Sequence, residues 1–137
     1  MIALTEDKRM LGYGGMTPYS NIFCFATTRR GGFSKGDYAS FNCTPYTGDD
    51  AESVRRNQEL LCNSMPQHPK ELVIPFQTHG IKVEVIDEKY LNATSDERTG
   101  MLQGVDALIT KEPGCCICIS TADCIPCLLY TSTSPRD

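Results

Sequence analysis

The sequence predicts an α+β protein with mixed β-sheets and flanking helices. Apolar runs of strand length, bounded by turn-forming residues, occur at residues 21–27, 105–110 and 115–120. One segment, residues 51–65, instead places apolar side chains near a single helical stripe. Expected strands outnumber expected helices, and expected hairpins alternate with long irregular connections. This arrangement favours an α+β fold over a regular βαβ repeat.

In the first half of the chain, the glycines near residue 14 and the following Pro18 predict a strand start and a turn. Residues 21–27 form the next expected strand, and a glycine-rich loop with two arginines follows it. Asp49 or Asp50 is an appropriate N-cap for the helix expected at 51–65. Asn57 and Gln58 interrupt its apolar stripe, so we expect them to form hydrogen bonds on the helix face.

In the second half, residues 72–76 predict a short strand, and residues 77–80 predict the turn that leaves it. A further strand follows around residues 83–87, where apolar and polar side chains alternate. Residues 88–104 are polar and lack strong periodicity, which indicates a long excursion with one helical turn. The Glu-Pro-Gly sequence at 112–114 predicts a tight turn that pairs residues 105–110 with 115–120 as a hairpin.

Length, charge and cysteine content limit the possible classes of protein. At 137 residues, a single domain is expected. The net charge of −4 argues against a general nucleic-acid or acidic-membrane surface, and no run approaches the roughly 18 apolar residues of a membrane helix. The first ten residues are mixed and charged, without an apolar signal-peptide core, so we expect a cytoplasmic protein. The eight cysteines are then expected to be reduced thiols.

Two short stretches carry the strongest chemical signal. Residues 77–80 (Gln-Thr-His-Gly) contain His79, and residues 121–126 (Thr-Ala-Asp-Cys-Ile-Pro) contain Asp123 and Cys124. Imidazole and thiolate are ligands that zinc prefers, and they are equally a base and a nucleophile. Asp123 is either a residue that orients a ligand or carries a proton, or simply a turn residue. His68 is expected to be a solvated loop histidine without a role.

Two other groups of residues have both a functional and a structural interpretation. Arg29 lies in the glycine-rich loop at 28–36, which either binds an anion or is a solvated turn. The period of two along 115–120 places Cys116 and Cys118 on one strand face. They form either a metal clip or small core-filling side chains, and the absence of a second ligand pair nearby in sequence favours the core.

Taken together, these residues resemble the YfiH-like family, which has long been labelled multicopper polyphenol oxidase or laccase. Its members are associated with zinc-dependent purine nucleoside phosphorolysis and adenosine deamination. Seven stretches match in order, at residues 28–34, 40–42, 48–50, 54–57, 77–80, 106–110 and 121–126.

The resemblance implies a layered α/β/β/α fold, of which this chain holds part, and small-molecule substrates, a purine nucleoside and phosphate. It implies that His79 and Cys124 bind zinc, that Asp123 assists catalysis, and that Arg29 and Asn42 bind substrate or phosphate. Copper is less expected, because laccase-type centres need many histidines and this sequence has two. Nothing in the sequence specifies the oligomeric state.

The resemblance ends before one further family motif, His-Ala-Gly-Trp-Arg-Gly, whose histidine supplies the third metal ligand. This sequence has no tryptophan and no histidine after His79. Residues 127–137 resemble a translated sequencing adapter, so we expect residues 1–126 to be the N-terminal part of one domain and 127–137 to be a non-native tail. A chain lacking the third ligand is expected to be inactive by itself.

Two other functions are compatible with the residues. One is a metal-free hydrolase or transferase with Cys124 as nucleophile and His79 as base. The other is a non-enzymatic, thiol-rich protein that binds metal or senses oxidants. A chelator would abolish a zinc-dependent activity, whereas iodoacetamide alone would abolish a thiol-dependent one.

Overall fold

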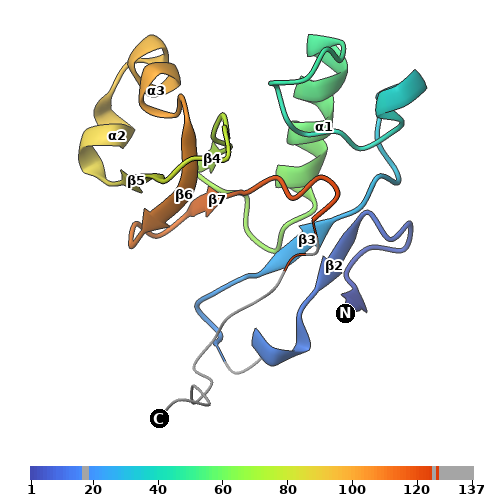
Figure 1. Cartoon of the computed structure of the whole chain (residues 1–137). Coiled ribbons are helices and arrows are strands. Elements are labelled where there is room, and N and C mark those ends of the chain that lie inside the picture. The colour runs from blue at the N-terminus through green and yellow to red at the C-terminus, as the bar shows by residue number, and fades with distance from the viewer. Residues whose placement is uncertain (17–18, 125, 127–137) are drawn as a thin grey trace, which may run out of the picture.

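A computed structural model describes residues 1–16, 19–124 and 126 of the chain (Figure 1). The expected tail at 127–137 lies outside the described residues. In these described ranges the elements are small helices and short strands in three sheets, which confirms the α+β class. In the described part of the chain, no helix combines the length and apolar character that crossing a bilayer requires.

The N-terminal part forms a three-stranded antiparallel sheet. Its strands are β1 (Ile2–Ala3), β2 (Met10–Gly12) and β3 (Phe25–Thr27), in that order. Strand β3 is therefore the end of the longer run expected at 21–27. Two short 3₁₀ helices follow β2 and β3, η1 (Gly14–Met16) and η2 (Gly36–Tyr38).

Helix α1 (Ala51–Asn63) confirms the amphipathic segment and its cap. The Asp50 carboxylate accepts a hydrogen bond from the Ser53 N–H, which satisfies one of the free amides of the first turn. Leu61 packs with Met10 and Phe41 in one of the two buried clusters. The C-terminal end of the helix therefore lies toward the three-stranded sheet (Figure 1).

The remaining strands pair in parallel across long stretches of sequence. Strand β4 (Glu71–Val73) pairs with β7 (Cys115–Ile117), and β5 (Lys82–Ile86) pairs with β6 (Val105–Thr110). The predicted hairpin between 105–110 and 115–120 is therefore wrong. The turn at 112–114 exists, but each strand finds its hydrogen-bond partners in a different, earlier strand.

The excursion at 88–104 contains more helix than expected. It forms α2 (Glu88–Asn92), capped by Asp87, and α3 (Ser95–Met101), which begins with a capping box formed by Thr94 and Glu97. These helices cover one face of the β5–β6 pair (Figure 1). The second buried cluster lies beneath them, and its members are Val73, Ile86, Tyr90 and Leu102.

The opposite face of the β5–β6 pair is exposed and apolar. Val85 and Ile109 are register partners on this face, and they are 50% and 57% exposed. Val83 is 49% exposed, and Ile81, just before β5, is 98% exposed. Period-two alternation thus buries Ile86 while leaving its neighbours uncovered.

Candidate functional site

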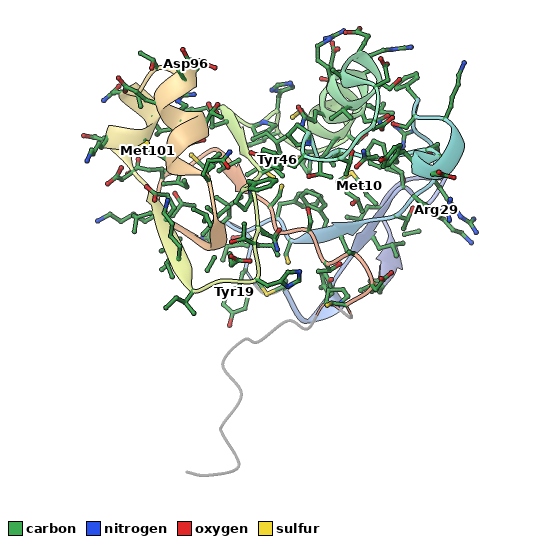
Figure 2. The ribbon with its side chains drawn as sticks, turned by 45° about the horizontal axis from the view of Figure 1, so that its top comes forward. Met10, Tyr19, Arg29, Tyr46, Asp96 and Met101 are labelled. Carbon is green, nitrogen blue, oxygen red and sulfur yellow. The ribbon has the colours of Figure 1, made fainter. Side chains whose placement is uncertain are left out.

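The turn at 77–80 begins from a rigid, buried segment. Val73 and Pro75 are fully buried, and the Tyr46 hydroxyl donates a hydrogen bond to the Ile74 carbonyl at 2.8 Å. The Tyr46 ring also contacts the Phe76 ring edge-on, with 5.0 Å between the centroids. Figure 2 shows Tyr46 in the middle of the molecule, between helices α2 and α3 on one side and helix α1 on the other. The start of the turn is therefore held by packing and by a hydrogen bond.

A single carboxylate holds the turn that contains His79. The backbone N–H groups of Thr78, His79 and Gly80 all donate to Asp106, at 3.3, 2.9 and 2.8 Å. His79 has φ of +57°, which lies in the left-handed region that non-glycine residues adopt only uncommonly. These N–H groups, that of Gly80 most of all, stabilise the ionised carboxyl and lower the pKa of Asp106.

The Gln77 side chain joins this turn to the second stretch. Its Nε2 donates to the Ser120 carbonyl at 3.1 Å, and its Oε1 accepts from the Ser120 N–H at 2.7 Å. A side-chain amide thus pairs with a backbone amide in the manner of a strand partner. We call this pair of hydrogen bonds the Gln77–Ser120 clamp. It places the turn carrying His79 beside the segment that leads to Cys124.

The second stretch is itself a tight turn. The Cys124 N–H donates to the Thr121 carbonyl at 2.7 Å, and Ala122 has φ of +44°. Asp123 and Cys124 are exposed, as is His79. The residues expected to perform chemistry are therefore accessible, on two turns that the clamp brings together.

The donor types at these turns suit zinc, but they form an incomplete set. Imidazole and thiolate are common zinc ligands, and a catalytic zinc site usually has three protein ligands. Among the described residues, no group of three or more histidine, cysteine, aspartate or glutamate side chains is arranged to hold a metal ion. His79 and Cys124 could thus supply only part of a zinc site.

Arg29 and Asn42 belong to a second assembly, the loop at 28–49. Arg29 is exposed, and its Nε donates to the Ala39 carbonyl at 3.0 Å. Figure 2 shows Arg29 at the edge of the molecule on the side of the three-stranded sheet, at the opposite end from Met101. The Asn42 amide nitrogen donates to Thr47 and to Asp49, each at 3.0 Å. The Asn42 side chain is therefore engaged within its own loop.

Asn57 organises this loop from helix α1. It is fully buried, and its Nδ2 donates to the Ser34 hydroxyl at 2.9 Å and to the Asn42 carbonyl at 2.8 Å. Its Oδ1 accepts from the Phe33 N–H at 2.8 Å. The expectation that Asn57 forms hydrogen bonds is confirmed. The hydrogen bond between Asn57 and Phe33 joins residues 24 positions apart in the sequence. The sequence did not indicate this partner; it showed only that a polar residue interrupts the apolar stripe of the helix.

The Asp49 carboxylate links two other residues of this loop by hydrogen bonds. It accepts from the Ser34 hydroxyl at 2.6 Å and from Asn42. These hydrogen bonds, that of Ser34 first, lower the pKa of Asp49. A hollow of about 140 Å³ lies nearby at the start of α1, and a larger one of about 470 Å³ lies against α2 and α3. Neither hollow is lined by His79 or Cys124.

Sequence reasoning named the stretches that contain Gln77 and Asp106 but assigned these two side chains no role. Both were visible only as parts of matching stretches, at 77–80 and 106–110. The prediction that Cys116 and Cys118 share a face is confirmed, because their Sγ atoms lie 3.8 Å apart. Both residues are half-buried.

Comparison with known proteins gives consistent relatives. A purine nucleoside phosphorylase of Bacteroides thetaiotaomicron is 63% identical over 130 residues, which cover 95% of this chain and 48% of that protein. Adenosine deaminase RL5, from an unknown prokaryotic organism, is 39% identical over 111 residues, covering 81% and 42%. The crystal structure of YlmD from Geobacillus stearothermophilus aligns with a TM-score of 0.61 at 28% identity, covering 75% of this chain and 39% of that one.

The chain therefore spans about half the length of the curated relatives it matches. The model of the protein family described as "Multi-copper polyphenol oxidoreductase laccase" matches residues 23–135 of this chain. This match confirms the resemblance drawn from the seven stretches. Since this match covers most of the sequence, the chain belongs to the multi-copper polyphenol oxidoreductase laccase family.

Proposed function

We propose that this chain is part of a purine nucleoside phosphorylase that also deaminates adenosine. The observation that carries the proposal is the 63% identity over 130 residues to the Bacteroides thetaiotaomicron purine nucleoside phosphorylase. The similarity to adenosine deaminase RL5 supports the second activity. The substrates are then a purine nucleoside with phosphate for one reaction, and adenosine with water for the other.

In this proposal, His79 and Cys124 are two ligands of a zinc ion, and the third comes from residues outside this chain. The chemistry that zinc supplies when bound is activation of a water for attack on a carbon such as purine C6. Asp106 holds the backbone around His79, and the clamp holds the segment before Cys124. Asp123, exposed next to Cys124, carries a proton or orients a ligand.

Phosphate binding is assigned to the loop at 28–49. The exposed Arg29 guanidinium is suited to a phosphate, because planar N–H groups bind its oxygens in pairs. Asn42 serves the same loop, where its contacts with Thr47 and Asp49 fix the backbone. Phosphorolysis then requires this loop to face the ribose C1′ of the nucleoside. A cytoplasmic location remains a prediction from the sequence.

The proposal also makes this chain inactive by itself, since two donors hold zinc weakly and leave the coordination geometry undefined. We would measure bound zinc, inosine phosphorolysis and adenosine deamination for two proteins. One is the 137-residue chain. The other is a hybrid in which the remaining residues of the Bacteroides relative follow residue 126. We expect zinc and both activities in the hybrid and neither in the chain alone.

His79→Ala in the hybrid should remove zinc and reduce both activities by at least about a hundredfold. His68→Ala is the matched control, because His68 is an exposed loop histidine whose Nδ1 lies 3.0 Å from the Pro69 carbonyl. Full activity of the His79 variant would refute the metal assignment. Activity that survives a chelator but is lost with iodoacetamide would instead favour the thiol enzyme.

A further inference from the structure

Four thiols gather where α1, β7 and the loop at 28–49 meet. Cys62 is buried on α1, Cys43 lies in the loop, and Cys116 and Cys118 lie on and just beyond β7. Burial raises the pKa of Cys62 and raises that of Cys43 to about 12, so these two thiols stay protonated. The remaining pair, Cys116 and Cys118, differs in that its two Sγ atoms lie only 3.8 Å apart.

Cys116 and Cys118 lie on the same extended segment, which forms hydrogen bonds with strand β4. Cys116 pairs with Leu72 within the β4–β7 ladder, and the Cys118 N–H donates to the Val73 carbonyl at 2.9 Å. The two side chains therefore stand on the same face, with 3.8 Å between their Sγ atoms. Residues two apart in an extended strand have Cα atoms about 6.6 Å apart, which is near the upper end of the range that a disulfide spans.

From this juxtaposition we propose that Cys116 and Cys118 form a redox-active dithiol, which closes to an intrachain disulfide by exchange with a low-molecular-weight disulfide such as oxidised glutathione. The Sγ atoms must approach to about 2.05 Å. Rotation of the two side chains and a bend at Ile117, the last residue of β7, bring this about.

The two thiols have distinct roles in the exchange. The Sγ atoms of Cys116 and Cys118 lie within hydrogen-bond distance of each other, and this interaction lowers the pKa of Cys116 and raises that of Cys118. The Cys116 thiolate attacks one sulfur of the incoming disulfide and expels one thiolate. Cys118 then attacks the Cys116 sulfur, its proton passes to the second leaving thiolate, and the Cys116–Cys118 bond forms. Two electrons leave the protein, and two small thiols are produced.

Closure of this disulfide would act on the candidate site. Cys118 precedes Ser120 by two residues, and both backbone groups of Ser120 are held in the Gln77–Ser120 clamp. A bend at Ile117 therefore displaces the segment that the clamp holds beside the turn containing His79. The inference does not depend on the proposed function, because it concerns only thiols and backbone of this chain.

The test is disulfide mapping on the reduced 137-residue chain. The chain is incubated with mixtures of oxidised and reduced glutathione, its free thiols are alkylated, and it is analysed by intact and tandem mass spectrometry. We expect the oxidised chain to lose the mass of two hydrogen atoms, to take up two fewer alkyl groups, and to carry its cross-link between Cys116 and Cys118. Amide exchange at Ser120 should become faster on oxidation.

Two variants separate the roles of the thiols. Cys118→Ser should stop at a glutathione adduct on Cys116, whereas Cys115→Ser, the matched control next to the pair, should close the disulfide as the wild type does. Retention of all eight alkylatable thiols in the oxidising mixtures would overturn the proposal. So would a cross-link mapped to another pair, or a stable glutathione adduct in the wild type. Unchanged exchange at Ser120 would overturn the link to the clamp.

Discussion

At the scale of single residues, Asp106 is the side chain on which the candidate site most depends. Three consecutive backbone N–H groups donate to its carboxylate, and His79 is the middle one of the three. An aspartate is suited to this position because an ionised carboxylate accepts several hydrogen bonds and donates none. The backbone of His79 is therefore held by a residue 27 positions away in the sequence.

The lowered pKa of Asp106 predicts a pH dependence of stability. Its folded-state pKa lies below the ordinary value of 3.8, so the unfolded chain binds this proton more readily. The carboxylate therefore stabilises the folded chain above about pH 3.8, and this stabilisation disappears as the pH falls through the folded-state pKa. Asp106→Asn should be less stable than wild type at neutral pH, and the difference should shrink in acid. Denaturant unfolding at a series of pH values measures it.

Asp37→Asn is the control for this experiment, because Asp37 is also an aspartate but is exposed in η2, away from the turn at 77–80. Its difference from wild type should stay small throughout. A constant difference between Asp106→Asn and wild type from neutral pH down to strong acid would contradict the assigned role of the carboxylate.

At the scale of elements, Asn57 connects helix α1 to the loop that contains Arg29 and Asn42. The buried amide is hydrogen-bonded on both its nitrogen and its oxygen, so its loss leaves several backbone and hydroxyl groups without partners. We expect Asn57→Ala to lower the free energy of unfolding by about 3 kcal/mol. Denaturant titration followed by circular dichroism would give this value.

Asn63→Ala provides the comparison on the same helix, because Asn63 is exposed at its last position. Its effect should stay within about 0.5 kcal/mol. Equal effects at the two positions would mean that the amide network does not stabilise the loop.

The helices α2 and α3 illustrate which element signals are local. Thr94 and Glu97 form the capping box that starts α3, and Asp87 caps α2. Such caps follow from adjacent residues alone, so the sequence contained the signal for these helices although their weak periodicity hid it. Strand pairing is different, because the Glu-Pro-Gly turn specified a change of direction without specifying a partner.

At the scale of the whole molecule, the exposed apolar face of the β5–β6 pair is the feature most expected to cause self-association. Val85 and Ile109 are paired across the two strands and are half exposed or more. Apolar side chains on an uncovered sheet face favour association between copies. We expect the chain to self-associate with rising concentration, and the double substitution Val85→Thr, Ile109→Thr to reduce this while keeping the strands. Analytical ultracentrifugation measures both effects.

The single substitution Ile22→Thr serves as control, because Ile22 is also 50% exposed but lies outside the three sheets. It should leave self-association nearly unchanged. A wild-type chain that stays monomeric at high concentration, with a cooperative melt, would contradict the prediction.

Features that depend on neighbouring residues could be predicted from the sequence alone. The helix α1 with its Asp50 cap, the turn at 77–80, and the shared face of Cys116 and Cys118 all follow from side-chain period or from capping within a few positions. The family followed from the order of short stretches. None of these inferences required knowing which distant segment lies nearby.

The parallel pairing of β4 with β7 and of β5 with β6, in place of the expected hairpin, depends on long-range packing. The same is true of the hydrogen bonds between Asp106 and the turn containing His79 and of those by which Gln77 joins that turn to Ser120. One cause explains all these cases. Backbone N–H and C=O groups form hydrogen bonds with any partner of suitable geometry, so their partners are selected by the packing of the whole chain rather than by local sequence.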